Sequence, residues 1–335
     1  MNRKGYKMRF VCILLSALLA GLIAIPTVSA DGSSADADNS SVTDTADTDS
    51  GSYFSYYSAN ENASRVNENL ILGCELQRGA ELAEYGGKKA ALIDGGKYAQ
   101  WDINIPNDGC YAVKLDYYNI TGKNSNVSMS LYIDGAMPFK ELGAIELPRC
   151  WADELDENNN FYTDIHGNDK LPEQREVLKW QELWLGDTQG MYTEPYEFFL
   201  TAGTHRIRIE YYDGDFALSG ITLGQPDTAP KYGDYLKEYS SKSDSVSDEP
   251  IIIEAEKPAY KSSSSLYAQN DRTNASVSPN RAGYTKLNFI GGSSWSYTGQ
   301  SITWDFDVKE EGWYTVSLKA RQNTNQGMKS NRSLL

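Results

Sequence analysis

The 335-residue sequence contains only two histidines, His166 and His205, and four cysteines. Two histidines far apart in the chain give no basis for a zinc site or a Cys-His catalytic pair. Basic residues are also scarce, with 31 Lys and Arg against 46 Asp and Glu, a net charge of -15. Since phosphate binding needs a basic face, this composition argues against a nucleic-acid partner. No nucleophile elbow or phosphate-binding glycine loop occurs, so we expect a protein that is not an enzyme.

Only one long apolar run is present, the 16 residues from Phe10 to Ile25. Four basic residues precede it and the small-residue ending Val28-Ser29-Ala30 follows it, which is typical of a secretory signal peptide. The run is shorter than the span of about 20 residues that crosses a membrane. We therefore expect residues 1–30 to be a signal peptide and the remainder to be secreted, with no membrane insertion after cleavage. An uncleaved membrane anchor is the alternative.

Two polar stretches separate the folded regions. Residues 31–52 contain six Asp and no Lys or Arg, and they read as a disordered Asp/Ser/Thr tether. Residues 226–249 form the second stretch, a linker that contains a short amphipathic pattern at Tyr232, Tyr235 and Leu236. This spacing predicts a short helix in the linker.

The sequence also repeats itself. A shift of 203 positions aligns residues 101–132 with residues 304–335 without a gap, and nine of the 32 positions are identical. Apolar residues alternate with polar ones in both copies, as at Trp101, Ile103 and Ile105 in the first copy. A glycine turn and a second alternating run follow each time. The pattern predicts two strands joined by a turn in each copy.

The alternation continues around Gly203, whereas residues 138–191 show no regular pattern. We expect an all-β fold made of two jelly-roll-like β-sandwich modules in tandem, residues 53–225 and 250–335. The first copy runs on for 92 residues beyond the aligned segment, whereas the second stops at Leu335. We therefore expect the second module to be incomplete and the chain to be a fragment.

Several segments resemble the β-sandwich carbohydrate-binding modules of families 6 and 35. In the first copy these are WDINIPNDGCYAVKLDYY, SLYIDG and FFLTAGTHRIRIEY, and in the second IIIEAE and WDFDVKEEGWYTVSLKARQN. The resemblance covers most of residues 69–224 and all of 250–335. It implies a non-catalytic region that binds an oligo- or polysaccharide.

A closer resemblance is to the N-terminal region of Gram-positive extracellular solute-binding proteins of sugar-type ABC transporters. It rests on IDGAMPFKE, HGNDKLPEQ, KWQE and GMYTEPYEFFL in this order, with IEAEKPAYKSSSSLYAQNDR and FIGGSSWSYTGQSITWDF later. This resemblance implies a cell-surface protein of sugar uptake, which meets a transporter permease through a domain beyond Leu335. Two alternatives stay open: an accessory binding region of a glycoside hydrolase, and a structural spacer that binds no sugar.

The same module families commonly hold a structural calcium ion with carboxylates of the first strand, so the resemblance implies calcium as a cofactor. Glu254 and Glu256 are spaced to lie on one face of a strand, and calcium requires several oxygen ligands. The corresponding residues of the first copy are Gly73 and Glu75, so one carboxylate is lost there. Two solvated strand carboxylates are the alternative.

Sugar recognition needs a flat apolar ring and polar groups that converge on hydroxyls. The candidate rings lie in the two irregular stretches: Trp151, Trp180, Trp184, Tyr192, Trp295 and Tyr297. The polar candidates lie in the first of these stretches: Asp187, with Asp164, Asn168 and Asp169. Packing of the rings under a long loop, and ordinary turn formation by Asp and Asn, are the alternatives.

Cys74, Cys110 and Cys150 remain after signal removal, an odd number for an oxidising compartment. Either two of them form a disulfide and the third stays a thiol, or all three are isolated buried thiols.

Overall fold

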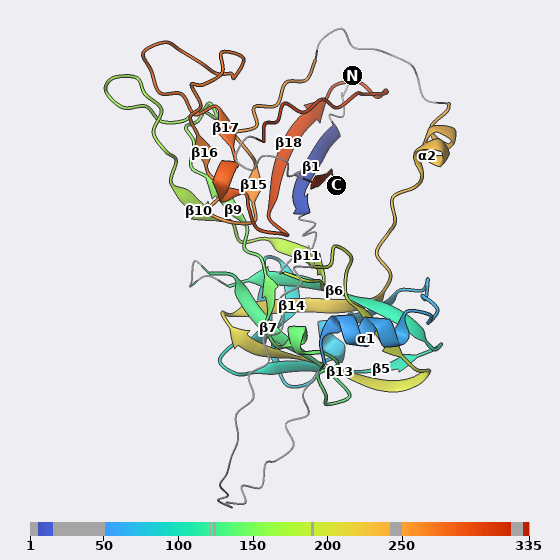
Figure 1. Cartoon of the computed structure of the whole chain (residues 1–335). Helices are drawn as coiled ribbons and strands as arrows, with labels where there is room; N and C mark the ends of the chain where they lie inside the picture. The colour runs from blue at the N-terminus through green and yellow to red at the C-terminus, as the bar shows by residue number, and fades with distance from the viewer. Residues whose placement is uncertain are drawn as a thin grey trace, which may run out of the picture.

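The structure, a computed structural model, describes residues 6–15, 51–120, 122, 125–188, 191–241, 250–322 and 331–334. Strands dominate it, with two short α-helices, α1 (Tyr53–Asn60) and α2 (Tyr232–Glu238). The described residues therefore have the all-β architecture that the alternating pattern predicts. Figure 1 shows a β-sandwich in the lower part of the view, and a second group of strands above it.

The larger sheet of the β-sandwich has seven strands. Their order is β11-β6-β14-β4-β3, with β12 also paired to β6 and β2 also paired to β14. The strands are β2 (Leu70–Gly73), β3 (Glu81–Tyr85), β4 (Lys88–Ile93), β6 (Gly109–Asn119), β11 (Trp180–Trp184), β12 (Glu197–Leu200) and β14 (Phe216–Gly224). All pairings are antiparallel, and β6 lies between β14 on one edge and both β11 and β12 on the other.

The smaller sheet has four antiparallel strands in the order β5-β13-β7-β8. They are β5 (Tyr98–Ile105), β7 (Val127–Ile133), β8 (Ile145–Leu147) and β13 (Gly203–Asp213). Trp101, Ile103 and Ile105 point into the core, as their alternation predicts, and none is more than 3% exposed. They share one cluster with Tyr111 and Leu115 of the facing sheet. Each such side chain contributes roughly 1.5–3 kcal/mol through burial, so the two sheets are held by their facing apolar sides.

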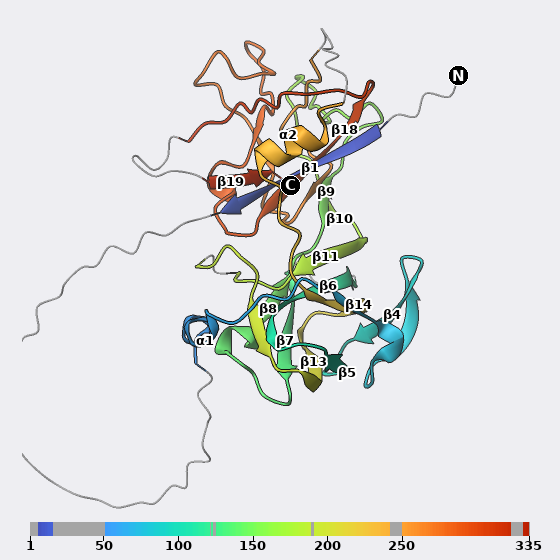
Figure 2. The ribbon, with the colours of Figure 1, turned by 90° about the vertical axis from the view of Figure 1, so that its right-hand side faces the viewer.

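A segment of the first repeat leaves the sandwich. Its strands β9 (Trp151–Asp153) and β10 (Gln174–Glu176) join β15 (Tyr260–Lys261) in a third sheet, whose order is β10-β9-β15-β18-β1-β19. Both views place β9 and β10 in the same group of strands as β18 (Ser301–Val308), away from the sandwich (Figures 1 and 2). The expectation of an irregular stretch is therefore wrong in part, because it contains strands of three to five residues. Strands this short give no detectable alternation.

The remaining elements belong to the second group or to connections. The strands are β1 (Tyr6–Leu15), β16 (Ala268–Gln269), β17 (Phe289–Ile290) and β19 (Asn331–Leu334), and the 3-10 helices are η1 (Cys74–Leu76), η2 (Lys140–Gly143) and η3 (Gly292–Ser294). β1 pairs antiparallel with β18, with Phe10 opposite Trp304. Removal of residues 1–30 as a signal peptide stays a prediction. The predicted tether at 31–52 lies outside the described residues except for its last two.

One side-chain hydrogen bond recurs at equivalent positions of the two aligned segments. The hydroxyl of Tyr111 donates to the Asn107 carbonyl at 2.9 Å, and the hydroxyl of Tyr314 donates to the Glu310 carbonyl at 2.6 Å. Both pairs differ by 203 positions. The turn after the first strand is thus closed in the same way in both copies.

The second strand of the second copy is not formed. β18 lies where the pattern predicts a strand, but residues 312–318 form none, and Tyr314, Val316 and Leu318 are 44%, 49% and 66% exposed. In the first copy the equivalent strand β6 pairs on both edges. No described strand pairs with residues 312–318 in this way, so alternation alone does not make them a strand.

The linker helix and the cysteines agree with expectations from the sequence. α2 falls at the predicted short helix, and the rings of Tyr235 and Tyr239 lie 5.8 and 6.5 Å from that of Trp313. Cys74, Cys110 and Cys150 are buried and free, so the alternative of isolated thiols holds. No helix among the described residues is long and apolar enough to cross a membrane.

Candidate functional site

Two of the predicted tryptophans lie on the outer side of the larger sheet. Trp180 and Trp184 are the first and last residues of β11, and they share one side of that strand. Across the ladder, Trp180 is opposite Tyr118 of β6 and Trp184 is opposite Lys114. Both rings are half-buried. With Tyr85 of β3, these residues form a surface that we call the aromatic face: Tyr85, Tyr118, Trp180 and Trp184.

The Trp180 ring is held at its edges. Its Nε1 donates to the Tyr85 carbonyl at 3.0 Å, and its centre lies 5.4 Å from the Tyr118 ring. The Tyr85 and Tyr118 rings are 6.3 Å apart. Because the indole N–H already has an acceptor, the orientation of the ring does not depend on a ligand.

The turn between β3 and β4 approaches these rings closely. Gly86 has φ +51°, and a Cβ atom there would lie 2.7 Å from Tyr118 Cε2 and 3.0 Å from Trp180 Nε1. A side chain at this position would displace a ring, and the left-handed backbone also disfavours one. Glycine at this position lets the turn pack against the aromatic face.

Charged groups alternate with the rings. The Lys88 ammonium lies 4.8 Å from the centre of the Trp180 ring and 2.9 Å from Asp116 Oδ2. The Lys114 ammonium lies 5.7 Å from the Trp184 ring and 2.8 Å from Glu182 Oε2. Each tryptophan therefore has one cation and one carboxylate beside it.

These charged groups are exposed enough to contact a ligand. Lys88 is 50% exposed and Glu182 is 65% exposed, whereas Asp116 is 25% exposed and also accepts a hydrogen bond from Ser219. Ion pairs this exposed contribute only about 0–1 kcal/mol to stability. Their donors and acceptors can therefore exchange partners with a ligand at small cost.

Other predicted residues of the first repeat are occupied by packing. Trp151 is 6% exposed in β9, so its ring has no open face on which a sugar could stack. Tyr192 is half-buried and meets the Tyr53 ring edge-on at 5.0 Å. Asp187 accepts hydrogen bonds from the backbone N–H groups of Met191 and Tyr192, the turn-forming role that was the alternative.

Trp295 and Tyr297 lie in the other group of strands, after η3. The Trp295 Nε1 donates to the Gln300 carbonyl at 3.2 Å, and the Arg332 guanidinium lies 4.5 Å from its ring. Tyr297 is 71% exposed. The predicted aromatic residues therefore do not form one common site. Among them, only Trp180 and Trp184 lie together on one strand.

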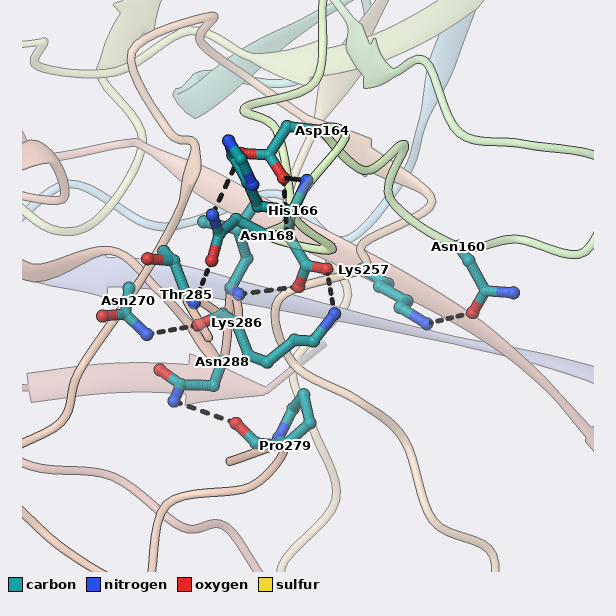
Figure 3. Close-up of polar contacts among 12 residues, drawn as sticks. Asn160, Asp164, His166, Asn168, Lys257, Asn270, Pro279, Thr285, Lys286 and Asn288 are labelled. Carbon is teal, nitrogen blue, oxygen red and sulfur yellow. Dashed lines mark hydrogen bonds and ion pairs between the residues drawn. The ribbon is translucent and has the colours of Figure 1, made fainter. Parts of the chain in front are cut away.

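Two of the polar residues predicted as sugar contacts, Asn168 and Asp169, join two segments of the chain instead (Figure 3). Asn168 Oδ1 accepts from the Thr285 backbone N–H at 2.8 Å. Asp169 accepts from the Lys286 ammonium at 2.6 Å and from the Leu287 N–H at 3.0 Å. Their polar atoms hold residues 164–169 against the segment that follows β16.

Asp164 closes the loop that presents these contacts. It accepts from the backbone N–H groups of His166 and Asn168 and from the Asn168 side chain, at 2.8 to 2.9 Å. The Asn168 hydrogen bonds hold the pKa of the Asp164 carboxyl below its usual value. Turn formation thus accounts for this aspartate.

The expected calcium pair is not arranged as predicted. Neither Glu254 nor Glu256 lies in a strand, and Glu254 is exposed whereas Glu256 is 1% exposed. Burial raises the pKa of Glu256 to about 7, and its Oε1 has no hydrogen-bond partner in the described part of the chain. That orphaned oxygen suits a cation, but the described residues contain no group of three or more His, Cys, Asp or Glu that could hold a metal. The prediction of two ligands on one strand face is therefore wrong.

Tyr118, Lys88 and Asp116 were not among the predicted site residues. Tyr118 and Asp116 occupy alternate positions of β6, between the inward-facing residues that the pattern identified. The alternation therefore placed them on the outer side. The alternation does not reveal the pairing of β6 with β11, which brings Tyr118 and Asp116 beside the tryptophans.

No family model matches the chain, and no curated protein matches it. Among solved structures, a family 35 carbohydrate-binding module from Clostridium thermocellum is 16% identical, with a TM-score of 0.29 over 48% of this chain and 99% of that one. A module of Cellvibrio mixtus lichenase 5A, in complex with cellotriose, is 16% identical, with a TM-score of 0.24 over 48% and 99%. A Podospora anserina β-(1,4)-mannanase is 11% identical, with a TM-score of 0.29 over 49% and 29%.

Proposed function

We propose that this chain is a secreted, non-catalytic carbohydrate-binding region whose aromatic face binds a polysaccharide. The observation that carries the proposal is the pair of tryptophans on one side of β11, each with a cation and a carboxylate beside it. Indole rings supply apolar area to the C–H face of a sugar ring, and charged groups bind its hydroxyls. The sequence resemblance to carbohydrate-binding modules supports the same role.

The spacing of the tryptophans favours a chain over a single sugar. Trp180 and Trp184 are four residues apart on one strand, which corresponds to about 13 Å. This distance is longer than one pyranose ring. A linear oligosaccharide lying along β11 would reach both rings, whereas a monosaccharide would reach one.

The context of this binding follows from the second resemblance. We infer that the region belongs to a cell-surface system of sugar uptake, in which it holds a polysaccharide near a solute-binding domain and its permease. Calcium belongs to the same proposal, in which Glu256 is the candidate ligand because its buried Oε1 has no hydrogen-bond partner in the described part of the chain.

The test is isothermal titration of the chain with linear oligosaccharides of increasing length, chosen from a glycan-array hit. We expect Trp180→Ala and Trp184→Ala each to weaken binding by about tenfold, because each removes one stacking surface. Trp313→Ala is the control, since its ring contacts α2 and lies outside the aromatic face. Unchanged affinity in both β11 variants would refute the site, and a folded chain that binds no glycan would favour a spacer.

A further inference from the structure

The sheet that joins the two repeats brings an amine, a carboxyl group and an amide together. Asp153 of β9 is directly opposite Gln174 of β10, and Lys261 of β15 is opposite Trp151 of β9. Asp153 and Trp151 are two residues apart, and alternate residues of a strand share one face of the sheet. The side chains of Lys261, Asp153 and Gln174 therefore lie next to one another on that face. None of them belongs to the aromatic face.

Each of these three side chains contacts the other two. Lys261 Nζ donates to Asp153 Oδ1 and to Gln174 Oε1, and Gln174 Nε2 donates to Asp153 Oδ1. The amine nitrogen thus lies beside an amide carbonyl, and one carboxylate oxygen contacts both the amine and the amide nitrogen. Transfer of an acyl group from an amide to an amine needs these parts: a nucleophile, an acyl donor and a proton carrier.

The surroundings of the amine favour its neutral form. The side chains of Lys261 and Asp153 are buried, and Lys261 is opposite Trp151 and Ile302, which are buried as well. Burial lowers the pKa of Lys261, although the attraction of Asp153 opposes that shift. A lower pKa increases the fraction of neutral amine, and only the neutral amine can attack a carbonyl carbon.

The second oxygen of Asp153 has no partner. Asp153 Oδ2 is buried and accepts no hydrogen bond from the residues that the structure describes. A buried carboxylate whose oxygens lack donors is costly, and transfer of a proton from the Lys261 ammonium to Asp153 would remove both buried charges. This transfer leaves a neutral amine beside the Gln174 carbonyl and a carboxylic acid that can donate a proton.

We propose that Lys261 and Gln174 condense to form an intramolecular isopeptide bond, with Asp153 as the proton carrier. Asp153 takes one proton from the ammonium, and the neutral Nζ attacks the Gln174 amide carbon Cδ. Asp153 then gives its proton to Nε2 as the Cδ–Nε2 bond breaks and ammonia leaves. The new amide nitrogen releases a second proton, which leaves with the ammonia as ammonium. No oxidant, cofactor or metal is needed for this balance.

The bond would link the two repeats covalently. Gln174 lies in β10, within the segment of the first repeat that leaves the sandwich, and Lys261 lies in β15 of the second repeat. Since an amide is a weak acyl donor, we expect slow conversion, and the newly folded chain keeps the ion pair that the structure shows. The inference is independent of sugar binding.

The experiment is intact mass spectrometry of the full chain, freshly purified and after prolonged incubation near neutral pH. We expect a loss of about 17 Da, the mass of the ammonia that the new bond releases, to increase with time. Tryptic digestion should then yield the peptide that ends at Arg175 joined to a peptide that contains Lys261, where trypsin no longer cuts. A constant mass, or the mass loss without this joined peptide, would overturn the proposal. A loss of about 18 Da in the same joined peptide would mean that water is released and that Gln174 is not the acyl donor.

Three variants test the roles of the residues. Lys261→Arg keeps a cation but removes the amine, so it should abolish the mass loss. Asp153→Asn should slow the loss about a hundredfold, because it removes the proton carrier. Lys286→Arg is the matched control: Lys286 also pairs with an aspartate between the same two segments, Asp169, and its variant should lose ammonia like the unsubstituted chain. Equal conversion in the Lys261 and Lys286 variants would contradict the assignment, and the mass of the unsubstituted chain decides the proposal even where a variant fails to fold.

Discussion

Lys261 of β15 and Asp153 of β9 form an ion pair whose side chains are 0% and 1% exposed. The Gln174 side chain of β10 hydrogen-bonds to both charged groups. Burial lowers the pKa of Lys261, and the attraction of Asp153 opposes that shift. The three residues come from three neighbouring strands of one sheet, and they join the segment that leaves the sandwich to the second repeat.

Removing one partner of this pair should be costly. Lys261→Ala leaves Asp153 buried without its cation, and we expect the free energy of unfolding to fall by about 3–5 kcal/mol. Urea denaturation measures the change. Lys237→Ala, which breaks an exposed pair with Asp234, should change stability by less than about 0.5 kcal/mol. The combined variant Lys261→Met, Asp153→Leu should recover most of the loss, and failure to recover would show that packing, not the unpaired charge, causes it.

Glu256 predicts how stability depends on pH. Its pKa is about 7 in the folded chain against an ordinary value of 4.5, because burial disfavours the carboxylate. Between these values the folded state binds more protons than the unfolded state. The free energy of unfolding should therefore decrease as pH rises through this window, by up to about 3 kcal/mol.

Urea midpoints at about pH 4.5 and about pH 8 test this dependence. Glu256→Gln should remove most of it, whereas Glu254→Gln, at an exposed position, should retain it. An equal pH dependence in the Glu256 variant and the unsubstituted chain would contradict the assignment.

Alanine substitutions at the neighbouring Gly86 and Gly87 distinguish the effect of backbone strain from the effect of displacing a ring. Both have positive φ, +51° and +77°, but only at Gly86 would a Cβ meet other atoms. Each change to alanine should cost about 1 kcal/mol for the left-handed backbone. Gly86→Ala should also shift the Trp180 fluorescence and weaken oligosaccharide binding, and Gly87→Ala should do neither. Identical behaviour of the two variants would mean that the turn does not position the aromatic face.

The three buried cysteines should be unreactive. Burial raises the pKa of the thiols of Cys74, Cys110 and Cys150, which keeps the reactive thiolate rare. In a Cys12→Ala variant, thiol titration should find no fast-reacting group in the native chain and three after denaturation. Fewer than three under denaturing, non-reducing conditions would reveal a disulfide.

The strands of the sandwich could be predicted because apolar and polar residues alternate along them, which identifies the buried and the exposed side of each strand. Trp101, Ile103 and Ile105 alternate with polar residues, and the structure buries all three. The same alternation places Asp116 and Tyr118 outward. Local pattern determines which side of a strand is buried, and it does so in the first repeat without knowledge of the neighbours.

Pairing between distant segments could not be predicted in this way. β9 and β11 have three and five residues, too few to show a period, and their partners lie far away in sequence. Trp151 and Trp180 look equivalent as loop tryptophans, yet pairing buries one and leaves the other on an outer surface. Residues 312–318 show the converse, because a good strand pattern forms no strand without neighbours on its edges.

The pairing of β9 with β15 limits how independently the two repeats can evolve. After a duplication, two copies that fold separately can be shuffled, lost or multiplied independently. Here the first copy contributes strands to the sheet of the second, and the buried Asp153 depends on Lys261 of that copy. Deletion of the second copy would leave Asp153 without its cation, so we expect the two repeats to be inherited as one unit.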